Sequence, residues 1–414
     1  MHINLRLFFK AEYLALFGTP FRLRRWAYVL FFTGLFWLLW ILVAIGRLLD
    51  HVLYPGFRRV EIREPIFIIA PPRSGTTLTQ KLMSLDEERF SFVRLYQTIL
   101  PSIFYYRLIK RLAGLDLRLG SPLGRLAAWA EKRFFGGWDD MHKLRFNEPE
   151  EDDGFFVYTF VTEAIYLLFP YIRELWGAGF CDDLPAQERR RVMRYYRGCL
   201  QRHLYAEGPG KTFLSKATQF SGSIDSILEE FPDARIITIA RSPYRSIASH
   251  VSVFYPVWQA HSPEIAKDSP ESRAYAGLAV AWFRHILEAK GRIDPQRFFW
   301  IRFSDLVRDP AATVARIYRH FGMTMSGAFK ELLEAAAARE GRFRSLHEYS
   351  LEEFGLSKEW ILRELDDVFE AYGLDRELER DRGVFRDLPS PTGTGGLASA
   401  GHEAALADQP GMTG

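Results

Sequence analysis

The chain has 414 residues, 48% of them hydrophobic, so it is long enough to bury a large core in one or two domains. Its 54 Lys and Arg residues against 51 Asp and Glu residues give a net charge of +3, which is too balanced to indicate a nucleic-acid-binding protein. The two cysteines, Cys181 and Cys199, form no C-x-x-C pair and indicate neither a disulfide framework nor a metal site.

The first 46 residues predict attachment to a membrane. Residues 26–46 carry no charge, and as a helix they would extend about 31 Å, close to the thickness of a bilayer core. In residues 1–25 apolar side chains alternate with Arg6, Lys10 and Glu12, which is typical of an interfacial amphipathic segment. The alternative for residues 26–46 is a buried core helix of a soluble protein. Basic residues flank both ends, so the sequence decides neither orientation nor whether the helix crosses the bilayer.

Residues 66–78 predict a strand, a tight loop and the start of a helix. The loop, residues 71–77, has the sequence PPRSGTT, and such a junction directs backbone N–H groups and a helix N-terminus toward an anion. Three side chains add hydroxyl donors: Ser74, Thr76 and Thr77. The loop is not a Walker A motif, because Ala70 stands at the first Gly and Thr76 at the Lys. The alternative is a simple turn in which Arg73 is a surface cation.

An apolar and basic region at residues 90–130 follows, with the spacing of helices. We expect mainly packing helices there, and a wall of an acceptor cleft is the alternative. Five acids then occupy residues 148–153, ahead of an apolar block at residues 155–161. An acidic cluster of this kind is usually solvated or lies at a helix N-terminus, but a carboxylate held against that block would have a raised pKa and suit a general base. His142 is a second candidate for that role.

The rest of the body alternates strands and helices. Residues 183–201 predict an exposed basic helix capped by Asp182 or Asp183. Strands are expected in residues 211–223, where Lys216 falls at the strand end, in 234–240 and in 298–303; helices follow at 224–231, 244–254 and 310–322. This order predicts an α/β fold with a mostly parallel central sheet and helices on both faces.

The second of these strands ends at Arg241, and the helix after it carries Ser249 about two turns in. A guanidinium and a hydroxyl placed in this way can approach one phosphate group.

At this point the chain resembles the sulfotransferases that use 3′-phosphoadenosine 5′-phosphosulfate (PAPS). Residues 71–77 resemble the family's loop for the 5′-phosphosulfate. Residues 231–235, leading to Arg241 and Ser249, resemble the segment that holds the 3′-phosphate. Residues 303–310 (FSDLVRDP) resemble the family's "YEDL…DP" segment, with Phe in place of the usual Tyr.

The acidic cluster at residues 148–153 and the segment 347–356 further resemble the bacterial branch of the family. Together these landmarks cover roughly residues 66–373. The resemblance implies a P-loop NTPase-like sulfotransferase fold and transfer of a sulfuryl group from PAPS to a hydroxyl or amine, without a metal. Sulfuryl transfer resembles phosphoryl transfer in its loose transition state, so positioned cations and N–H groups do most of the catalysis.

The resemblance also implies roles for single residues. Arg73 would stabilise the leaving phosphate oxygen, and Lys216 would neutralise the sulfuryl group or the 5′-phosphate. The 3′-phosphate would be held by Arg241 and Ser249. The 5′-phosphate would lie in a cradle formed by Ser74, Gly75, Thr76 and Thr77.

Some relatives have an acid shortly after the loop helix, but here residues 92–95 read FVRL, so that base is absent. We therefore choose Glu150 as the general base, with Glu151 and His142 as alternatives. Helix capping is the competing interpretation of the acids.

The sequence thus predicts a membrane-associated sulfotransferase, with a catalytic domain at residues 60–383 and a disordered tail at residues 384–414. The expected partners are the lipid bilayer and a small-molecule acceptor, possible acceptors being a lipid or glycolipid, and no nucleic acid. We expect the domain to face the cytoplasm of a bacterium, with a lumenal orientation as the alternative. The competing functions are a P-loop nucleotide kinase, which would need the missing Walker Lys, and a non-catalytic membrane scaffold.

Overall fold

The computed structural model describes residues 1–121, 124–125, 129, 149–340 and 350–376, all within the unit Met1–Leu378. Two predicted features, His142 and the tail at residues 384–414, therefore lie outside the described residues.

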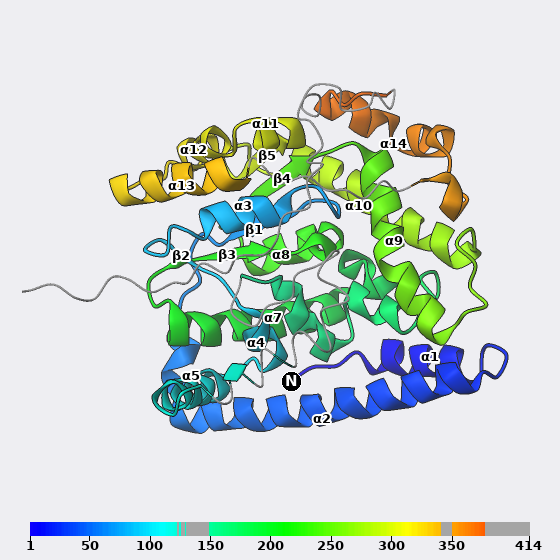
Figure 1. Cartoon of the computed structure of the whole chain (residues 1–414), viewed down its shortest axis with the longest axis horizontal. Helices are drawn as coiled ribbons and strands as arrows, with labels where there is room; N and C mark the ends of the chain where they lie inside the picture. Colours follow the sequence, from blue (N-terminus) through cyan, green and yellow to red (C-terminus); the bar gives the residue numbers. More distant parts are fainter. Residues whose placement is uncertain (122–123, 126–128, 130–148, 341–349, 377–414) are drawn as a thin grey trace, which may run out of the picture. The chain divides into compact units, whose positions relative to one another are not determined.

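The centre of the fold is a five-stranded sheet in the order β2-β3-β1-β4-β5 (Figure 1), and every pair of neighbouring strands is parallel. The strands are β1 (Ile66–Ile68), β2 (Phe90–Ser91), β3 (Thr212–Lys216), β4 (Arg235–Ala240) and β5 (Phe298–Arg302). This arrangement confirms the predicted parallel α/β sheet. Because all strands run the same way, the loops that follow β3, β1 and β4 all leave the sheet at the carboxyl-terminal ends of the strands.

Both faces of the sheet are buried, which explains why β1 is apolar at every position. Phe67 belongs to the larger of two buried clusters, together with Phe156 and Tyr196, whereas Ile66 and Ile68 belong to the other. Successive side chains of a strand point to opposite faces, so an uninterrupted apolar run is what a two-sided core requires.

Helices cover the two faces (Figure 1). On the face of the smaller cluster lie α3 (Thr76–Met83), α12 (Pro310–His320) and α13 (Gly327–Glu340). The larger cluster is formed with α7 (Ala186–Glu207), α8 (Ile224–Glu230), α9 (Pro243–His261), α10 (Pro270–Arg292) and α14 (Lys358–Tyr372). The remaining short elements are η1 (Pro55–Arg59), α4 (Leu95–Ile99), α5 (Ile103–Arg118), η3 (Asp152–Thr159), η4 (Glu163–Leu167), η5 (Trp176–Ala178), η6 (Cys181–Asp183), η7 (Thr218–Gly222), α11 (Phe303–Arg308) and η8 (Glu352–Phe354).

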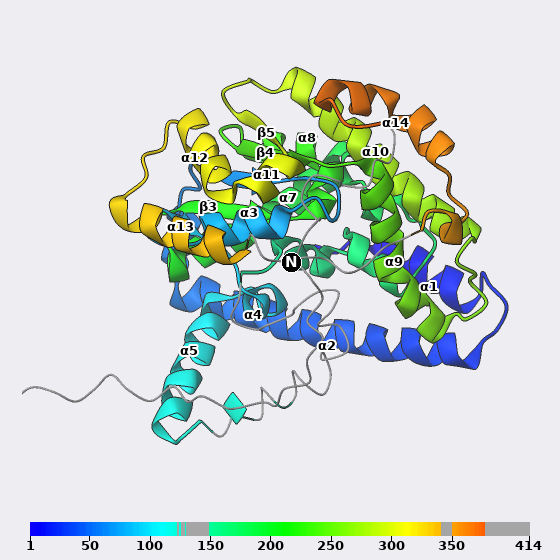
Figure 2. The same ribbon diagram turned by 45° about the horizontal axis from the view of Figure 1, so that its top comes forward.

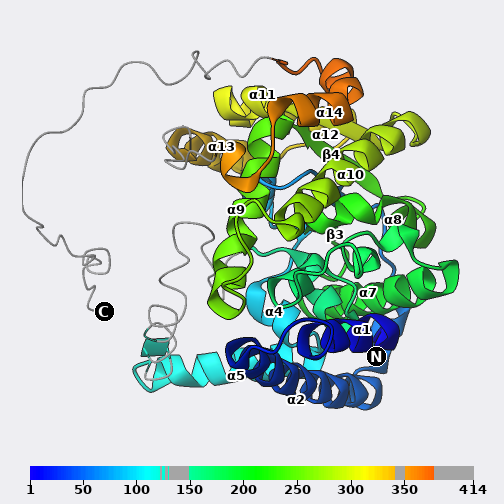
Figure 3. The same cartoon turned by 90° about the vertical axis from the view of Figure 1, so that its right-hand side faces the viewer.

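The N-terminal region forms two helices, α1 (Leu5–Leu16) and α2 (Leu23–Leu53), seen side by side in Figure 3. Helix α2 is longer than the predicted segment 26–46 because it continues through Arg47 and Asp50, whose charges are buried against the domain. Among the described residues, α2 is the helix long and apolar enough to cross a membrane, by length and composition alone.

The prediction of an exposed helix at residues 183–201 is wrong in two respects. Helix α7 buries one whole side, including Tyr196 and Cys199, and Pro185 occupies its N-cap position without a side-chain hydrogen bond. The predicted cap, Asp182, instead accepts hydrogen bonds from the backbone N–H groups of Asp225 and Ser226, at the start of α8. A cap was thus recognised correctly as a residue type but assigned to the wrong helix.

Candidate active site

The loop of residues 71–77 joins β1 to α3 and has an unusual backbone. Arg73 and Gly75 both adopt positive φ angles, 61° and 94°. A side chain at Gly75 would meet Leu306 and Phe303 at 3.0–3.1 Å, so only glycine fits there. The segment 303–310, singled out by resemblance, therefore packs directly on this loop. A left-handed non-glycine residue such as Arg73 stores strain, which is typical of functional loops.

The end of β4 lies against the same loop. The Arg241 guanidinium donates a hydrogen bond to the carbonyl oxygen of Arg73 and lies 4.1 Å from the centre of the Phe303 ring. On α9, the Ser246 hydroxyl donates to the carbonyl oxygen of Pro72 at 2.5 Å. The structure thus brings Arg241 to the predicted phosphate loop, although these residues are 168 positions apart.

Two hydroxyl groups near this junction are buried without a hydrogen-bond partner among the described residues. They belong to Ser74, in the loop, and Ser249, on α9. Thr76 is also buried, whereas Thr77 and Arg73 are exposed. A buried hydroxyl without a partner costs free energy, and a bound anion would satisfy it. Both hydroxyls are therefore candidates for contacts with the phosphate groups of a donor.

Lys216 is the last residue of β3. It pairs with Ile68, the last residue of β1, so it lies beside the loop that follows β1. Its side chain is buried, and its Nζ lies 2.6 Å from a carboxylate oxygen of Glu151. The next acid, Asp152, accepts hydrogen bonds from the backbone N–H of Lys216 and from the Ser215 hydroxyl at 2.9–3.0 Å. A further bond, from the Tyr196 hydroxyl, completes this set. Asp152 therefore fixes the acidic segment to β3, and its burial raises its pKa to about 6.

The predicted base, Glu150, is buried on the other side of this segment. Its backbone N–H donates to Val93 and its carbonyl oxygen accepts from the Gln80 side chain on α3. Its carboxylate accepts from the N–H of Glu151. These contacts position the segment, and the assignment of Glu150 as base stays a prediction. The carboxylate of Glu151 contacts the side chain of Lys216, a predicted catalytic cation.

Sequence reasoning missed a second group of buried titratable side chains beside Lys216. Glu163, on η4, has its carboxylate 3.3 Å from the Tyr275 hydroxyl, 3.4 Å from the Thr218 hydroxyl and 3.8 Å from His250 Nε2. Burial, followed by the charge of Glu151, raises the pKa of Glu163 to about 8. Burial also lowers the pKa of His250 to about 3, and raises that of Asp153 well above its ordinary value, with Glu151 and Glu163 adding to the increase in Asp153.

A signal for this group was present in the sequence. Glu163 is a lone acid in the apolar stretch 160–169 (FVTEAIYLLF), where a charge is out of place unless it has partners. His250 directly follows Ser249. Raised and lowered pKa values cluster at functional sites, so this group extends the candidate site beyond the anion loop.

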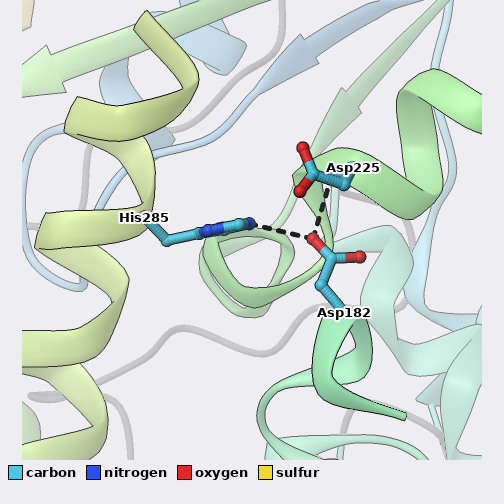
Figure 4. Close-up of side chains that lie close together, drawn as sticks. All are labelled: Asp182, Asp225 and His285. Carbon is cyan, nitrogen blue, oxygen red and sulfur yellow. Dashed lines mark hydrogen bonds and ion pairs between the residues drawn. The ribbon is translucent and has the colours of Figure 1, made fainter. Parts of the chain in front are cut away.

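One cluster in the described residues has the composition of a metal site: Asp182, Asp225 and His285, whose ligand atoms lie within 4.8 Å of one another (Figure 4). Asp182 already accepts from two backbone N–H groups and from His285 Nε2, all at 2.9 Å, and Arg292 pairs with Asp225 at 3.0 Å. Burial lowers the pKa of His285, but the hydrogen bond and charge of Asp182 raise it overall. These contacts explain the cluster as an anchor for α8, and we assign no metal to it.

A groove of about 610 Å³ lies along β5, the edge strand of the sheet. Its lining residues are Lys290, Pro295, Phe298, Phe299, Trp300, Arg302, Asp305, Arg316 and His320. None of the candidate site residues contributes to it.

Comparison with known proteins identifies the family. The model of the sulfotransferase family matches residues 65–327, which is more than half of the chain. The chain belongs to the sulfotransferase family. A menaquinone sulfotransferase of Mycobacterium tuberculosis, omega-hydroxy-beta-dihydromenaquinone-9 sulfotransferase Stf3, is 22% identical over 372 residues, covering 85% of each chain.

Solved structures agree on the fold. The crystal structure of sulfotransferase STF9 from Mycobacterium avium has a TM-score of 0.65 at 20% identity, covering 78% of this chain and 81% of that one. Sulfotransferase STF1 from Mycobacterium tuberculosis has a TM-score of 0.55 at 19% identity, covering 79% and 81%. Membership of the sulfotransferase family, shown by the family model, makes the protein an enzyme that transfers sulfuryl groups, and the kinase and scaffold alternatives are not favoured.

Proposed function

We propose that this sulfotransferase takes the sulfuryl group from PAPS and transfers it to a hydroxyl or amine of a lipid-like acceptor at a membrane surface. PAPS supplies an activated sulfuryl group on a phosphate leaving group. The observation that carries the donor assignment is the contact of Arg241 with the loop, next to the two unpartnered hydroxyls of Ser74 and Ser249.

The two phosphate groups of the donor would be bound at two separate places. At the first, the N-terminus of α3 and the N–H groups of Ser74 to Thr77 would hold the 5′-phosphate. At the second, Arg241 and Ser249 would hold the 3′-phosphate, which distinguishes PAPS from ATP. Arg73, exposed at the loop, would stabilise charge on the leaving oxygen, and Lys216 would do so on the sulfuryl side.

A base is needed to take the proton of the acceptor. Glu150 and Glu151 are our two candidates in the described part of the chain, and the contact with Lys216 favours Glu151. We expect Glu151→Gln to lower the rate and to abolish the acidic limb of its pH dependence, while Glu150→Gln loses stability instead. The opposite result would restore Glu150 as the base.

Two observations support an amphiphilic acceptor. The relative named above acts, by its name, on a menaquinone derivative, and this chain carries a long apolar helix whose outer side is exposed. We also propose membrane attachment, with the catalytic domain on the cytoplasmic side, where PAPS would be supplied.

Binding of adenosine 3′,5′-bisphosphate, measured by calorimetry, tests the donor assignment. We expect Arg241→Ala to weaken binding by about 10- to 100-fold, as for a hydrogen bond to a charged group. Arg245→Ala, at an exposed arginine in the first turn of α9, is the matched control and should bind normally. Equal affinity of the two variants would refute the assignment.

The acceptor is tested by incubating sulfur-labelled PAPS with lipid extracts and with soluble extracts of cells. We expect label to enter only lipid. Equal labelling of soluble compounds would contradict a lipid acceptor while leaving the donor assignment intact.

A further inference from the structure

We propose that α2 does not cross the bilayer but lies along its surface, forming with α1 and α5 a one-sided lipid-binding face, here called the N-terminal platform. This inference deepens the membrane attachment of the proposed function and rests on it. Helices α1 and α5 both lie beside α2 in the three views (Figures 1, 2 and 3).

Both ends of α2 are bound to the same catalytic domain. Near its start, Arg25 is 2% exposed and pairs with Glu264, just after α9. Near its end, Asp50 is fully buried and pairs with Arg202 of α7 at 2.9 Å. These positions are 25 residues apart, about 38 Å along the helix, which exceeds the thickness of a bilayer core of about 30 Å. A crossing helix would have to break one of these two ion pairs, each of which buries its α2 member, or carry part of the domain through the lipid.

Helix α2 packs one side on the domain and leaves the rest of its surface bare. The inner side is buried near both ends, at Arg25 and Val29 and again at Val43, Arg47 and Asp50, and is half-buried between them at Phe36, Trp37 and Trp40. The outer side is wide and carries these exposed large apolar side chains: Leu23, Leu30, Phe31, Phe32, Leu35, Leu38, Ile41, Leu42, Ile45, Leu48, Val52 and Leu53. Such a division, with one side packed on protein and the other bare, is typical of a helix lying in an interface, whereas a spanning helix meets lipid all round.

Helix α5 extends the bare surface. It starts on α2, where Asp50 accepts hydrogen bonds from the Ser102 hydroxyl and the N–H of Phe104, and Tyr105 donates to the carbonyl of Leu42. Its own exposed apolar residues are Leu108, Leu112, Leu115 and Leu117. On α1, the apolar residues Leu5, Phe9 and Tyr13 are also exposed, and their spacing of four residues places them on one side of that helix.

The charge of the platform indicates what covers it. In residues 1–59 and 103–118 every exposed charged side chain is basic, while the acids Glu12, Asp50 and Asp116 are partly or wholly buried. The exposed cations are Arg6, Lys10, Arg22, Arg24, Arg58, Arg59, Arg107, Lys110, Arg111 and Arg118. The whole chain is nearly neutral, so the platform is more basic than the chain as a whole, although Lys110 is paired with Glu207 at 2.6 Å. Exposed apolar side chains bordered by cations fit a bilayer that contains anionic lipids.

A short segment of the chain also connects the platform to the candidate site at Lys216. Residues 152–159 form η3: Asp152, at its start, holds the N–H of Lys216, and Thr159, at its end, accepts from the N–H of Asn4 ahead of α1. Phe160 then packs on Phe8 of α1, with ring centres 5.2 Å apart. Eight residues thus join the surface that would contact lipid to the site that would receive the acceptor.

Cysteine labelling in sealed membrane vesicles tests the orientation of α2 with the full chain. Arg22→Cys and Arg59→Cys place a thiol just before and just after α2 and its following turn, and the parent chain, whose Cys181 and Cys199 are buried, gives the background. We expect both positions to react with a membrane-impermeant maleimide in the same vesicle orientation. Reaction in opposite orientations would show that α2 spans the bilayer and would overturn the proposal.

Vesicle binding tests the lipid-facing side. Leu38→Asp combined with Ile45→Asp should weaken binding to vesicles of phosphatidylglycerol and phosphatidylcholine at least about tenfold, while Leu332→Asp, at an exposed leucine of α13, should not. The parent should bind pure phosphatidylcholine more weakly, by about fivefold for each cation engaged.

Three outcomes would overturn the platform. Equal vesicle binding by the double variant and the control would exclude the proposed face. Unchanged vesicle binding together with loss of a dimer in solution would assign the face to a second copy of the chain. Equal binding of the parent to both kinds of vesicle would exclude the role of charge. Binding of adenosine 3′,5′-bisphosphate should be the same in all these variants, so its loss would count against the donor site and not the platform.

Discussion

Buried polar groups occur in two regions of this enzyme, and the two regions treat them differently. Where α2 meets the domain, Asp50 is fully buried and accepts from Arg202, Ser102 and the first N–H groups of α5. Beside the carboxyl-terminal ends of the central strands, the hydroxyls of Ser74 and Ser249 are also buried and have no partner among the described residues. Asp50 thus has its partners within the fold, whereas the two serine hydroxyls would find theirs in the phosphate groups of the proposed donor.

The same difference appears in the carboxylates. The oxygens of Asp50 have partners at 2.9–3.2 Å, whereas Glu163 has only longer contacts of 3.3–3.8 Å, and burial raises its pKa to about 8. A charge without close partners in a buried site is costly, and such costs are kept where function requires them. Substitutions in the two regions should therefore fail in different ways.

The largest effect is expected at Arg73. Arg73→Ala should abolish transfer, with a loss of at least about 10³-fold, because a cation that stabilises the leaving group acts mainly in the transition state. The side chain is exposed, so the midpoint of thermal unfolding should change little. Labelled transfer from PAPS measures the loss, and Arg63→Ala, at an exposed arginine outside the loop, is the control. Full activity of Arg73→Ala would refute the assignment.

The next effect concerns stability. Asp50→Ala leaves the Arg202 guanidinium buried without its partner, and should lower the free energy of unfolding by about 3–5 kcal/mol. Denaturant unfolding measures this loss, and activity per folded molecule should be unchanged. Removing both charges, as Asp50→Ala with Arg202→Met, should recover part of the stability. A loss below about 1 kcal/mol in the single variant would mean that the pair contributes no more than a surface salt bridge.

These two residues also show what the sequence could and could not predict. Arg73 was recognised because a strand, a loop and a helix are consecutive, and their local pattern is legible. Arg241 and Lys216 followed from the rule that ligands bind where parallel strands end. Asp50 was not singled out in the sequence, because its partner, Arg202, lies 152 residues away and its burial depends on tertiary packing.

Glu163 was missed for the same reason. Its neighbours come from η7, α9 and α10, and nothing in the sequence shows that these elements converge. The cap Asp182 was likewise seen but assigned to the adjacent helix α7, because the competing N–H groups belong to Asp225 and Ser226, more than 40 residues on. Local patterns thus predicted the sheet and the anion loop, while contacts between distant segments decided the rest.

An intermediate effect is expected for Glu163, and its sign depends on pH. The pKa of Glu163 rises from 4.5 to about 8 on folding, so between these values the folded chain binds a proton that the unfolded chain has lost. Proton binding by Glu163 therefore stabilises the folded chain at low pH, and this stabilisation is lost as the pH rises from 4.5 to about 8. Glu163→Gln has no titrating carboxyl at this position. From about pH 5 to about pH 8, the free energy of unfolding of the parent should therefore fall by about 1–3 kcal/mol relative to that of the variant. A constant difference across this range would mean that Glu163 keeps an ordinary pKa.

The smallest effect is expected at Ser249, and it distinguishes the two regions most directly. Ser249→Ala removes a buried hydroxyl that has no partner among the described residues, so it should leave the free energy of unfolding unchanged or raise it, in contrast to Asp50→Ala. Binding of adenosine 3′,5′-bisphosphate should weaken about tenfold, because the hydroxyl finds its partner only in the complex. Ser252→Ala is the matched control one turn along α9, where the hydroxyl already donates to a backbone carbonyl at 2.7 Å, and it should bind normally. If Ser249→Ala instead destabilised the protein and left binding unchanged, the hydroxyl would belong to the fold, and Arg241 alone would remain to hold the 3′-phosphate.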